Sequence, residues 1–168
     1  IARLDADDYS FPQRLEQQVS FMEQNPEIVF CGSRFKELVG DKYFPQRVKF
    51  IEKDDDIRKI VSCFNPFPHS TIMIRKNAFT KSGGYDLKFK YGQDYELWVR
   101  MLSLGEAHIL DNELCVIRMG NHSLSSKNKR KLKLEGLKIR WRAFRKFGGD
   151  PSEAFYYFMK SMTGLIFP

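Results

Sequence analysis

Hydrophobic positions along the chain alternate between a helical period and short apolar runs, which predicts an α/β domain. Apolar residues recur three or four positions apart in the segments expected to be helical, which are residues 12–24, 54–63, 94–104, 128–147 and 151–163. Short apolar or alternating runs predict strands at residues 1–4, 28–31, 70–75, 107–110 and 114–119. Residues 34–50 are expected to form a hairpin or loop that turns at Gly40 and Asp41.

Three of the expected helices carry an apolar stripe on one side. The stripes are Leu15, Val19 and Met22 in the first, Leu97, Trp98, Met101 and Leu102 in the second, and Leu134, Leu137, Trp141 and Phe144 in the third. A stripe at this spacing is typical of a helix that packs against a core.

Three carboxylates lie within four positions near the start of the chain, in the run LDADD at residues 4–8. Like charges this close repel one another, and a cation between them relieves the repulsion. Asp5 and Asp7 are two positions apart, so their side chains point the same way on an extended segment. The end of a strand is also where ligands bind in open α/β folds. The alternative is a solvated acidic loop, with Asp8 capping the following helix.

Two longer motifs follow, NPFPHSTIMIRKNAFTKSGGYD at residues 65–86 and FKYGQDYELWVRM at residues 89–101. With LDADD, in this order and spacing, they resemble the second half of a family 2 glycosyltransferase of the GT-A fold. The resemblance covers about residues 1–122. It implies that these residues form the C-terminal half of a catalytic domain whose nucleotide-binding half precedes Ile1. Residues 123–168 are expected to form a basic amphipathic helical tail.

The resemblance implies an inverting, metal-dependent glycosyltransferase that acts in cell-surface polysaccharide synthesis. Its donor would be a nucleoside diphosphate sugar, with a UDP-sugar favoured, and its acceptor a glycan or a lipid-linked glycan. Mn²⁺ or Mg²⁺ would be held by Asp7 and Asp5, because hard cations prefer carboxylate and phosphate oxygens. Asp94 would be the general base that takes the proton of the acceptor hydroxyl. Its position at the start of a helix also fits an N-cap.

The resemblance assigns further residues with less specific roles. His122 would complete the metal site, or is a polar loop residue without a ligand role. Gln93 stands where the family usually has Glu, and Gly84 lets the chain turn tightly near the acceptor. Trp98 would either stack on a sugar or lie in the core. The residues expected to contact substrate are Arg3, Asp5, Asp8, His69, Gly84, Gln93 and Trp98.

The net charge of +7 is concentrated near the C-terminus. Residues 118–147 carry eleven Lys or Arg and one acid, Glu135. A basic amphipathic helix binds an anionic membrane surface, whereas an ordinary packed helix with a solvated cationic face has the same composition. Nucleic acid is a less favoured partner. A non-catalytic basic adaptor for a membrane surface or nucleic acid is therefore the alternative to an enzyme.

Two other observations restrict the class of protein. A phosphotransferase of the haloacid dehalogenase type also has two Asp after a strand, but it needs Thr or Val where this chain has Tyr9. The three cysteines are widely spaced and odd in number, which indicates reduced core residues. With no apolar run of membrane-spanning length, we expect a cytoplasmic protein, with peripheral attachment at the inner face of the cell membrane as a further expectation.

Overall fold

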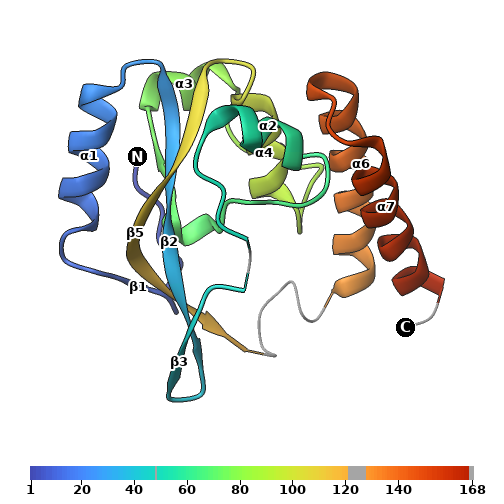
Figure 1. Cartoon of the computed structure of the whole chain (residues 1–168), viewed down its shortest axis with the longest axis horizontal. Coiled ribbons are helices and arrows are strands. Elements are labelled where there is room, and N and C mark those ends of the chain that lie inside the picture. Colours follow the sequence, from blue (N-terminus) through green and yellow to red (C-terminus); the bar gives the residue numbers. More distant parts are fainter. Residues whose placement is uncertain (48, 121–127, 167–168) are drawn as a thin grey trace.

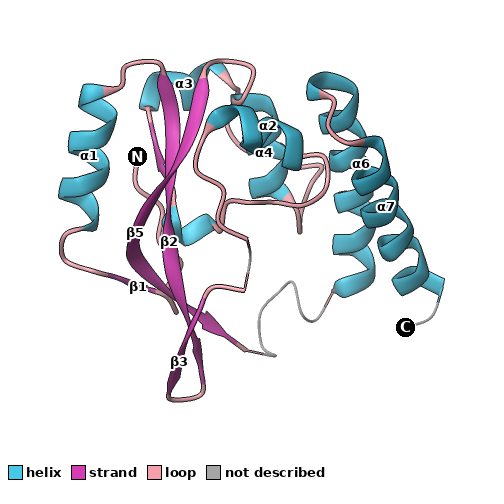
Figure 2. Ribbon diagram, viewed as in Figure 1, coloured by secondary structure: helices cyan, strands magenta, loops and turns pink. Residues whose placement is uncertain are grey.

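The computed structural model describes residues 1–47, 49–120 and 128–166, which form a mixed β-sheet with helices on both faces (Figure 1, Figure 2). The strands are β1 (Tyr9–Ser10), β2 (Ile28–Val39), β3 (Lys42–Pro45), β4 (Met73–Ile74) and β5 (Glu106–Met119). The helices are α1 (Arg14–Gln24), α2 (Asp54–Ile60), α3 (Lys76–Lys81), α4 (Gln93–Met101), α6 (Lys129–Phe147) and α7 (Pro151–Ile166), with a 3₁₀ turn η1 (His69–Thr71).

The two long strands β2 and β5 run parallel at the centre of the sheet. β1 pairs antiparallel with β5, while the other edge of β2 pairs first with β4 and then with β3. Beyond β4, Ala2 forms an isolated bridge with Met73, so the expected strand at residues 1–4 is reduced to one bridge at the sheet edge. The predicted hairpin is confirmed, since Gly40 turns between β2 and β3 with a φ of 59°.

Hydrophobic residues pack on both faces of the sheet. One face is covered by α1, which lies on the opposite side of the sheet from α2, α4 and α6 in Figure 1. The larger cluster is on that second face and includes Phe30, Phe67, Leu97, Trp98, Met101, Ile139 and Ala143. The predicted apolar face of residues 94–104 is therefore confirmed. All three cysteines are free and buried, as predicted.

The apolar face predicted for the first helix is wrong in part. Met22 is buried, but Leu15 and Val19 are 53% and 43% exposed. Arg14 and Gln18 are buried in their place. Their side chains donate hydrogen bonds to backbone carbonyl oxygens near the sheet edge, which belong to Arg3, Thr71 and Ile72. Because these hydrogen bonds satisfy their polar groups, Arg14 and Gln18 are buried on the face where apolar residues were expected.

The stripe predicted for residues 128–147 is also wrong in part, because only Leu137 and Phe144 of its four residues are half-buried. In α6 the buried residues are Ile139 and Ala143, whereas Leu134 and Trp141 are 46% and 59% exposed. Ile139 packs closely on Gly92, where a Cβ atom would lie 2.9 Å from the Ile139 Cδ1. This contact fixes which side of α6 faces α4.

Two predicted strand segments have other bounds in the structure, and one helix was missed. The segment expected as a strand at residues 70–75 begins as the 3₁₀ turn η1 and keeps only β4 as strand. The two strands expected between residues 107 and 119 are one continuous strand, β5, with register irregularities opposite Ser33 and Arg34. Helix α3 was not predicted at all.

Candidate active site

The acidic run at the start of the chain forms a turn. The N–H of Asp8 donates to the carbonyl oxygen of Asp5 at 3.2 Å, so the segment is not extended as the two-residue spacing suggested. Asp7, at the tip of the turn, is exposed and makes no hydrogen bond or ion pair with any described residue. The turn therefore presents one exposed carboxylate, without a partner among the described residues, to an external cation.

Asp8 links three segments of the chain. Its carboxylate accepts hydrogen bonds from the Ser70 hydroxyl and from the N–H of Arg118, the latter at 2.9 Å. Burial raises the pKa of Asp8, and the negative charges of Asp7 and Asp5 raise it further. The helix-cap role for Asp8 is wrong, because α1 begins six residues later without a side-chain cap.

A second cluster surrounds His69 in the turn η1. The Arg3 guanidinium donates to the Asp5 carboxylate at 2.8 Å and to the His69 Nε2 at 3.3 Å. The Tyr85 hydroxyl lies 2.7 Å from the same Nε2, and the Asp5 N–H donates to the Ser70 hydroxyl at 3.0 Å. The adjacent residues His69 and Ser70 of η1 thus connect the acidic turn to Tyr85.

The geometry defines the protonation of His69. Because an Arg Nε can only donate, the His69 Nε2 accepts and the neutral ring carries its proton on Nδ1. This Nδ1 lies 3.8 Å from the Asp5 carboxylate. Burial lowers the pKa of His69, which favours the neutral ring, although the charges of Asp94 and Asp5 act in the opposite direction.

Asp94 lies in the first turn of α4, as its second residue. The N-cap position belongs to Gly92, so the N-cap interpretation of Asp94 is wrong. The Asn65 side-chain amide donates to the Asp94 Oδ2 at 3.0 Å, and the backbone N–H of Tyr95 also donates to the carboxylate. Burial raises the pKa of Asp94, while these donors and the charge of His69 lower it. The positive end of the helix dipole also favours the ionised form.

The structure brings most of the predicted site residues together around η1. Those linked by hydrogen bonds or by electrostatic interaction are Arg3, Asp5, Asp8, His69 and Asp94. Gln93 is exposed as the first residue of α4. Gly84 has a φ of 68°, in the left-handed region that favours glycine. His122 lies outside the described residues.

Trp98 does not reach the surface. Its side chain is fully buried and stacks on Phe30 at a centroid distance of 5.3 Å, and its ring lies at 61° to the His69 ring with a centroid distance of 6.1 Å. The core interpretation therefore holds, and no ring face is available to a sugar. Trp98 contributes to the site by packing beside His69.

Sequence reasoning missed several residues that hold the site in place. Asn65 and Ser70 are the partners of the two key carboxylates, and Asn65 also accepts from the N–H of Phe67 at 3.1 Å in an Asx turn. Asn followed by Pro signals such a turn, but nothing in the sequence indicates that the amide reaches Asp94. Glu135, the one acid of the basic segment, accepts three backbone N–H groups immediately before α4, those of Lys90, Tyr91 and Gly92.

Arg100 braces the glycine turn that precedes Tyr85. Its guanidinium binds the Glu96 carboxylate through two nitrogens, at 2.9 and 2.7 Å. It also donates to the carbonyl oxygens of Ser82 and Gly84. Glu96 is 3% exposed, and its carboxylate also lies 3.6 Å from the Arg142 guanidinium. Tyr85 thereby receives a fixed position against His69.

We expect Arg100→Leu to lower the free energy of unfolding by about 3 kcal/mol, because it leaves the buried Glu96 carboxylate with only the more distant Arg142 guanidinium, at 3.6 Å. Chemical denaturation measures this change, with exposed Arg130→Leu as the control that stays near the wild type. The double variant Glu96→Leu/Arg100→Leu should recover part of the loss. Equal stability of Arg100→Leu and the wild type would contradict a bracing role.

The acidic turn is suited to a divalent cation that is shared with substrate. Among the described residues no three His, Cys, Asp or Glu side chains gather closely enough to hold a metal ion by themselves. Mg²⁺, however, is usually held by one or two carboxylates together with substrate phosphates. The exposed carboxylate of Asp7, next to Asp5 and Asp8, fits that kind of shared coordination.

Comparison with known proteins relates the chain to a protein family. The pattern of Glycosyl transferase family 2 matches residues 1–83. The amylovoran biosynthesis glycosyltransferase AmsE of Erwinia amylovora is 32% identical over 99% of this chain and 62% of its own length. The O-antigen biosynthesis glycosyltransferase WbnJ of Escherichia coli is 39% identical over 61% of this chain and 39% of its own.

The fold is similar to that of a solved structure. The crystal structure of S. aureus TarS 1-349 superposes with a TM-score of 0.58 at 11% identity, covering 95% of this chain and 44% of TarS. The chain belongs to family 2 of the glycosyltransferases, with an α/β architecture that resembles the GT-A fold. It spans 62% of the length of AmsE and 39% of that of WbnJ.

Proposed function

We propose that this chain carries the acceptor and catalytic part of an inverting glycosyltransferase. The observation that carries the proposal is that the turn η1 contacts two carboxylates of the acidic run. Ser70 donates a hydrogen bond to Asp8, and His69 lies next to Asp5 and Tyr85. A third carboxylate, that of Asp94, interacts electrostatically with His69. In this proposal, a carboxylate turn for the donor diphosphate lies next to a half-buried carboxylate for the acceptor.

The chemistry follows from the environment of Asp94. Its ionised carboxylate would accept the proton of the acceptor hydroxyl as that oxygen attacks the sugar, so the configuration at the sugar carbon inverts. Asn65 and the first turn of α4 keep the carboxylate oriented. A positioned general base of this kind accelerates a reaction by about 10²–10⁴-fold.

The acidic turn would act on the leaving group. Asp7 would bind Mn²⁺ or Mg²⁺, with Asp5 and Asp8 at its sides and His122 as a further candidate. When bound, the cation neutralises the charge that develops on the departing diphosphate. Arg3 holds the Asp5 carboxylate at 2.8 Å and so fixes its orientation.

The substrates are proposed at the level of chemical class. The donor is a nucleoside diphosphate sugar, with a UDP-sugar favoured, and the acceptor is a glycan or lipid-linked glycan of a cell-surface polysaccharide. The printed names of AmsE and WbnJ, which refer to amylovoran and O-antigen biosynthesis, support this choice. The alternative, a basic adaptor without catalysis, gives the cluster around η1 no role.

The raised pKa of Asp94 predicts the pH dependence of transfer. The base acts only when ionised, so kcat/KM should rise with pH through a pKa above the ordinary value of about 3.9 and then level off. Asn65→Ala removes a donor that lowers the Asp94 pKa, so it should move this rise to higher pH. Steady-state rates across the pH range measure both effects, and an unmoved profile for Asn65→Ala would contradict the assignment.

A donor screen tests the proposed function. The full-length protein is incubated with UDP-, GDP- and dTDP-sugars and Mn²⁺, and release of nucleoside diphosphate is measured with and without a chelator. The proposal expects release from one donor that stops when the metal is removed. A folded protein that turns over none of them, with or without a glycan acceptor, would overturn it.

A further inference from the structure

The net charge of the chain is concentrated on its last two helices. Residues 128–168 contain ten Lys or Arg and three acids, whereas residues 1–127 contain eighteen of each. The α6–α7 hairpin (residues 129–166) therefore carries a charge of +7 on an otherwise neutral protein. A polyanionic surface would attract this hairpin and no other large part of the chain.

Large apolar side chains are exposed on the same hairpin. Trp141, Phe155 and Tyr156 are each more than half exposed, and Leu134, Phe158 and Met159 are more than 40% exposed. On α6, Leu134 and Trp141 share one helical stripe with the exposed cations Lys138 and Arg145. Aromatic and basic residues interleaved in this way are typical of helices that lie in the membrane interface.

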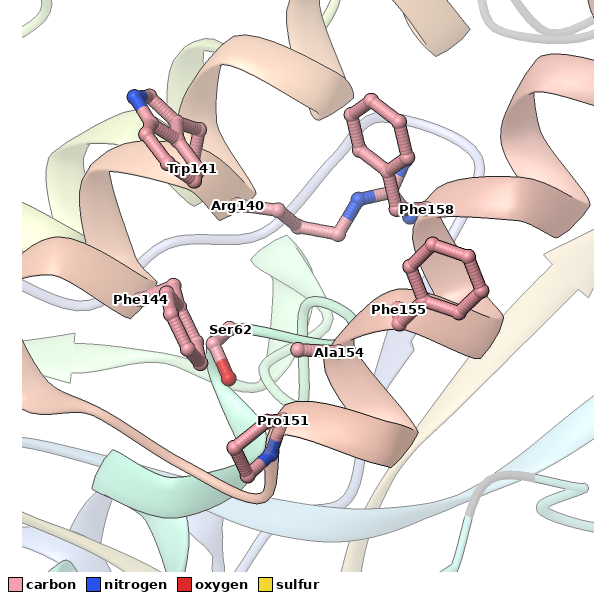
Figure 3. A pocket seen from close by; sticks show the side chains of 8 residues that line it. All are labelled: Ser62, Arg140, Trp141, Phe144, Pro151, Ala154, Phe155 and Phe158. Atoms are coloured by element: carbon pink, nitrogen blue, oxygen red, sulfur yellow. The ribbon is translucent and has the colours of Figure 1, made fainter.

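Between the two helices lies an apolar pocket of about 430 Å³ (Figure 3). Trp141 and Phe144 line it from α6, and Phe155 and Phe158 line it from α7. Figure 3 shows Arg140 extending from α6 towards α7 between these rings. The pocket therefore combines an apolar wall with a cation, which matches a molecule that has an apolar chain and an anionic head.

The charge of Arg140 has no acidic partner among the described residues. Its guanidinium donates to the Ser161 hydroxyl at 2.6 Å and to the carbonyl oxygen of Cys63 at 3.3 Å, which are both neutral acceptors. A charge that is partly removed from water and paired only with neutral groups favours a nearby anion. A lipid phosphate would supply that anion.

The hairpin contacts the loop that leads into the active site. Arg140 binds the backbone at Cys63, and the Phe64 ring packs on Tyr157 at a centroid distance of 5.8 Å. The next residue, Asn65, donates to Asp94. A surface bound to the hairpin therefore lies next to the loop that positions the proposed base.

We propose that the α6–α7 hairpin binds the surface of an anionic phospholipid bilayer. The exposed stripe of α6 faces the headgroups, and the pocket takes an acyl chain. The proposed contact is with one leaflet. Within residues 1–47, 49–120 and 128–166, none of the helices has both the length and the hydropathy of a transmembrane span. Vesicle binding tests this inference without donor or acceptor, so its outcome is independent of the transfer reaction.

The charge contribution is tested by sedimentation of the full-length protein with vesicles. Vesicles of phosphatidylglycerol and phosphatidylcholine should bind the protein, whereas phosphatidylcholine alone should bind it weakly, and added salt should release it. Lys138→Gln/Arg145→Gln should weaken binding about thirtyfold, because each cation near an anionic surface contributes about a factor of five. Lys76→Gln/Lys88→Gln removes the same charge elsewhere and should cause little change.

The aromatic contribution is tested separately. Trp141→Ser/Phe155→Ser should weaken binding about a hundredfold, because two side chains lose their burial in lipid. Both residues are exposed, so circular dichroism should remain as in the wild type. Tyr43→Ser/Leu87→Ser removes two exposed apolar side chains from other elements and should bind as the wild type does.

Two results would overturn the proposal. One is equal binding by the hairpin variants and their controls. The other is a dimer in solution that dissociates in Trp141→Ser/Phe155→Ser while vesicles bind no protein, since that result assigns the apolar face to a second copy of the chain.

Discussion

Asp94→Asn is expected to reduce sugar transfer by about 10²–10⁴-fold, the contribution of a positioned general base. The amide keeps the size of the carboxylate and can still accept the hydrogen bond of Asn65, but it cannot take a proton from the acceptor. Initial rates of transfer by the full-length protein measure the effect. Asp55→Asn is the matched control, because Asp55 is likewise in the first turn of a helix but is exposed.

Stability separates this loss from unfolding. Because the folded-state pKa of Asp94 is raised, its neutral form stabilises the fold below pH about 3.9, and this contribution is lost as the pH rises through the folded-state pKa. At neutral pH, Asp94→Asn should therefore be at least as stable as the wild type, and the difference should shrink in acid. Full transfer by this variant would exclude Asp94 as the base.

Asp7→Ala is expected to reduce metal-dependent turnover by about a hundredfold to a thousandfold, because metal coordination of a leaving diphosphate contributes several kcal/mol. The Asp7 carboxylate makes no bond within the described protein, so its removal should leave the free energy of unfolding unchanged. Turnover as a function of Mn²⁺ concentration measures the effect, and the variant should need more metal.

Asp41→Ala provides the comparison for Asp7→Ala. Asp41 is also an exposed acid in a turn, between β2 and β3, and it lies outside the proposed site. Its removal should leave the metal dependence as in the wild type. If Asp7→Ala and Asp41→Ala show the same metal dependence, the cation is not held by the acidic turn.

Local patterns in the sequence predicted a large part of the fold. The apolar face of α4 and the hairpin at Gly40 depend on residues close in sequence, and the structure contains both. The order of α and β segments was predicted in part, since α3 was missed and the two strands expected between residues 107 and 119 are one. The faces of α1 and α6 were wrong in part, because they depend on distant partners. Arg14 and Gln18 are buried through backbone carbonyls 11 to 58 residues away.

The candidate site shows the same limit. Its motifs placed Asp94 at the start of a helix and the acidic run before the first one. The partners that orient these carboxylates are distant in sequence, with Asn65 29 residues from Asp94 and Ser70 62 residues from Asp8. No local pattern encodes such contacts. The prediction that the Asp5 and Asp7 side chains point the same way assumed an extended segment. The run forms a turn instead, and side chains do not alternate in a turn.

The most direct test of the account measures donor binding and sugar transfer on the same preparation of the full-length Asp94→Asn variant. With Mn²⁺ present, we predict a Kd for the nucleotide sugar equal to that of the wild type, and a transfer rate at least a hundredfold lower. This result would assign Asp94 to the acceptor step rather than to donor binding. Transfer at the wild-type rate, or loss of donor binding together with transfer, would contradict the account.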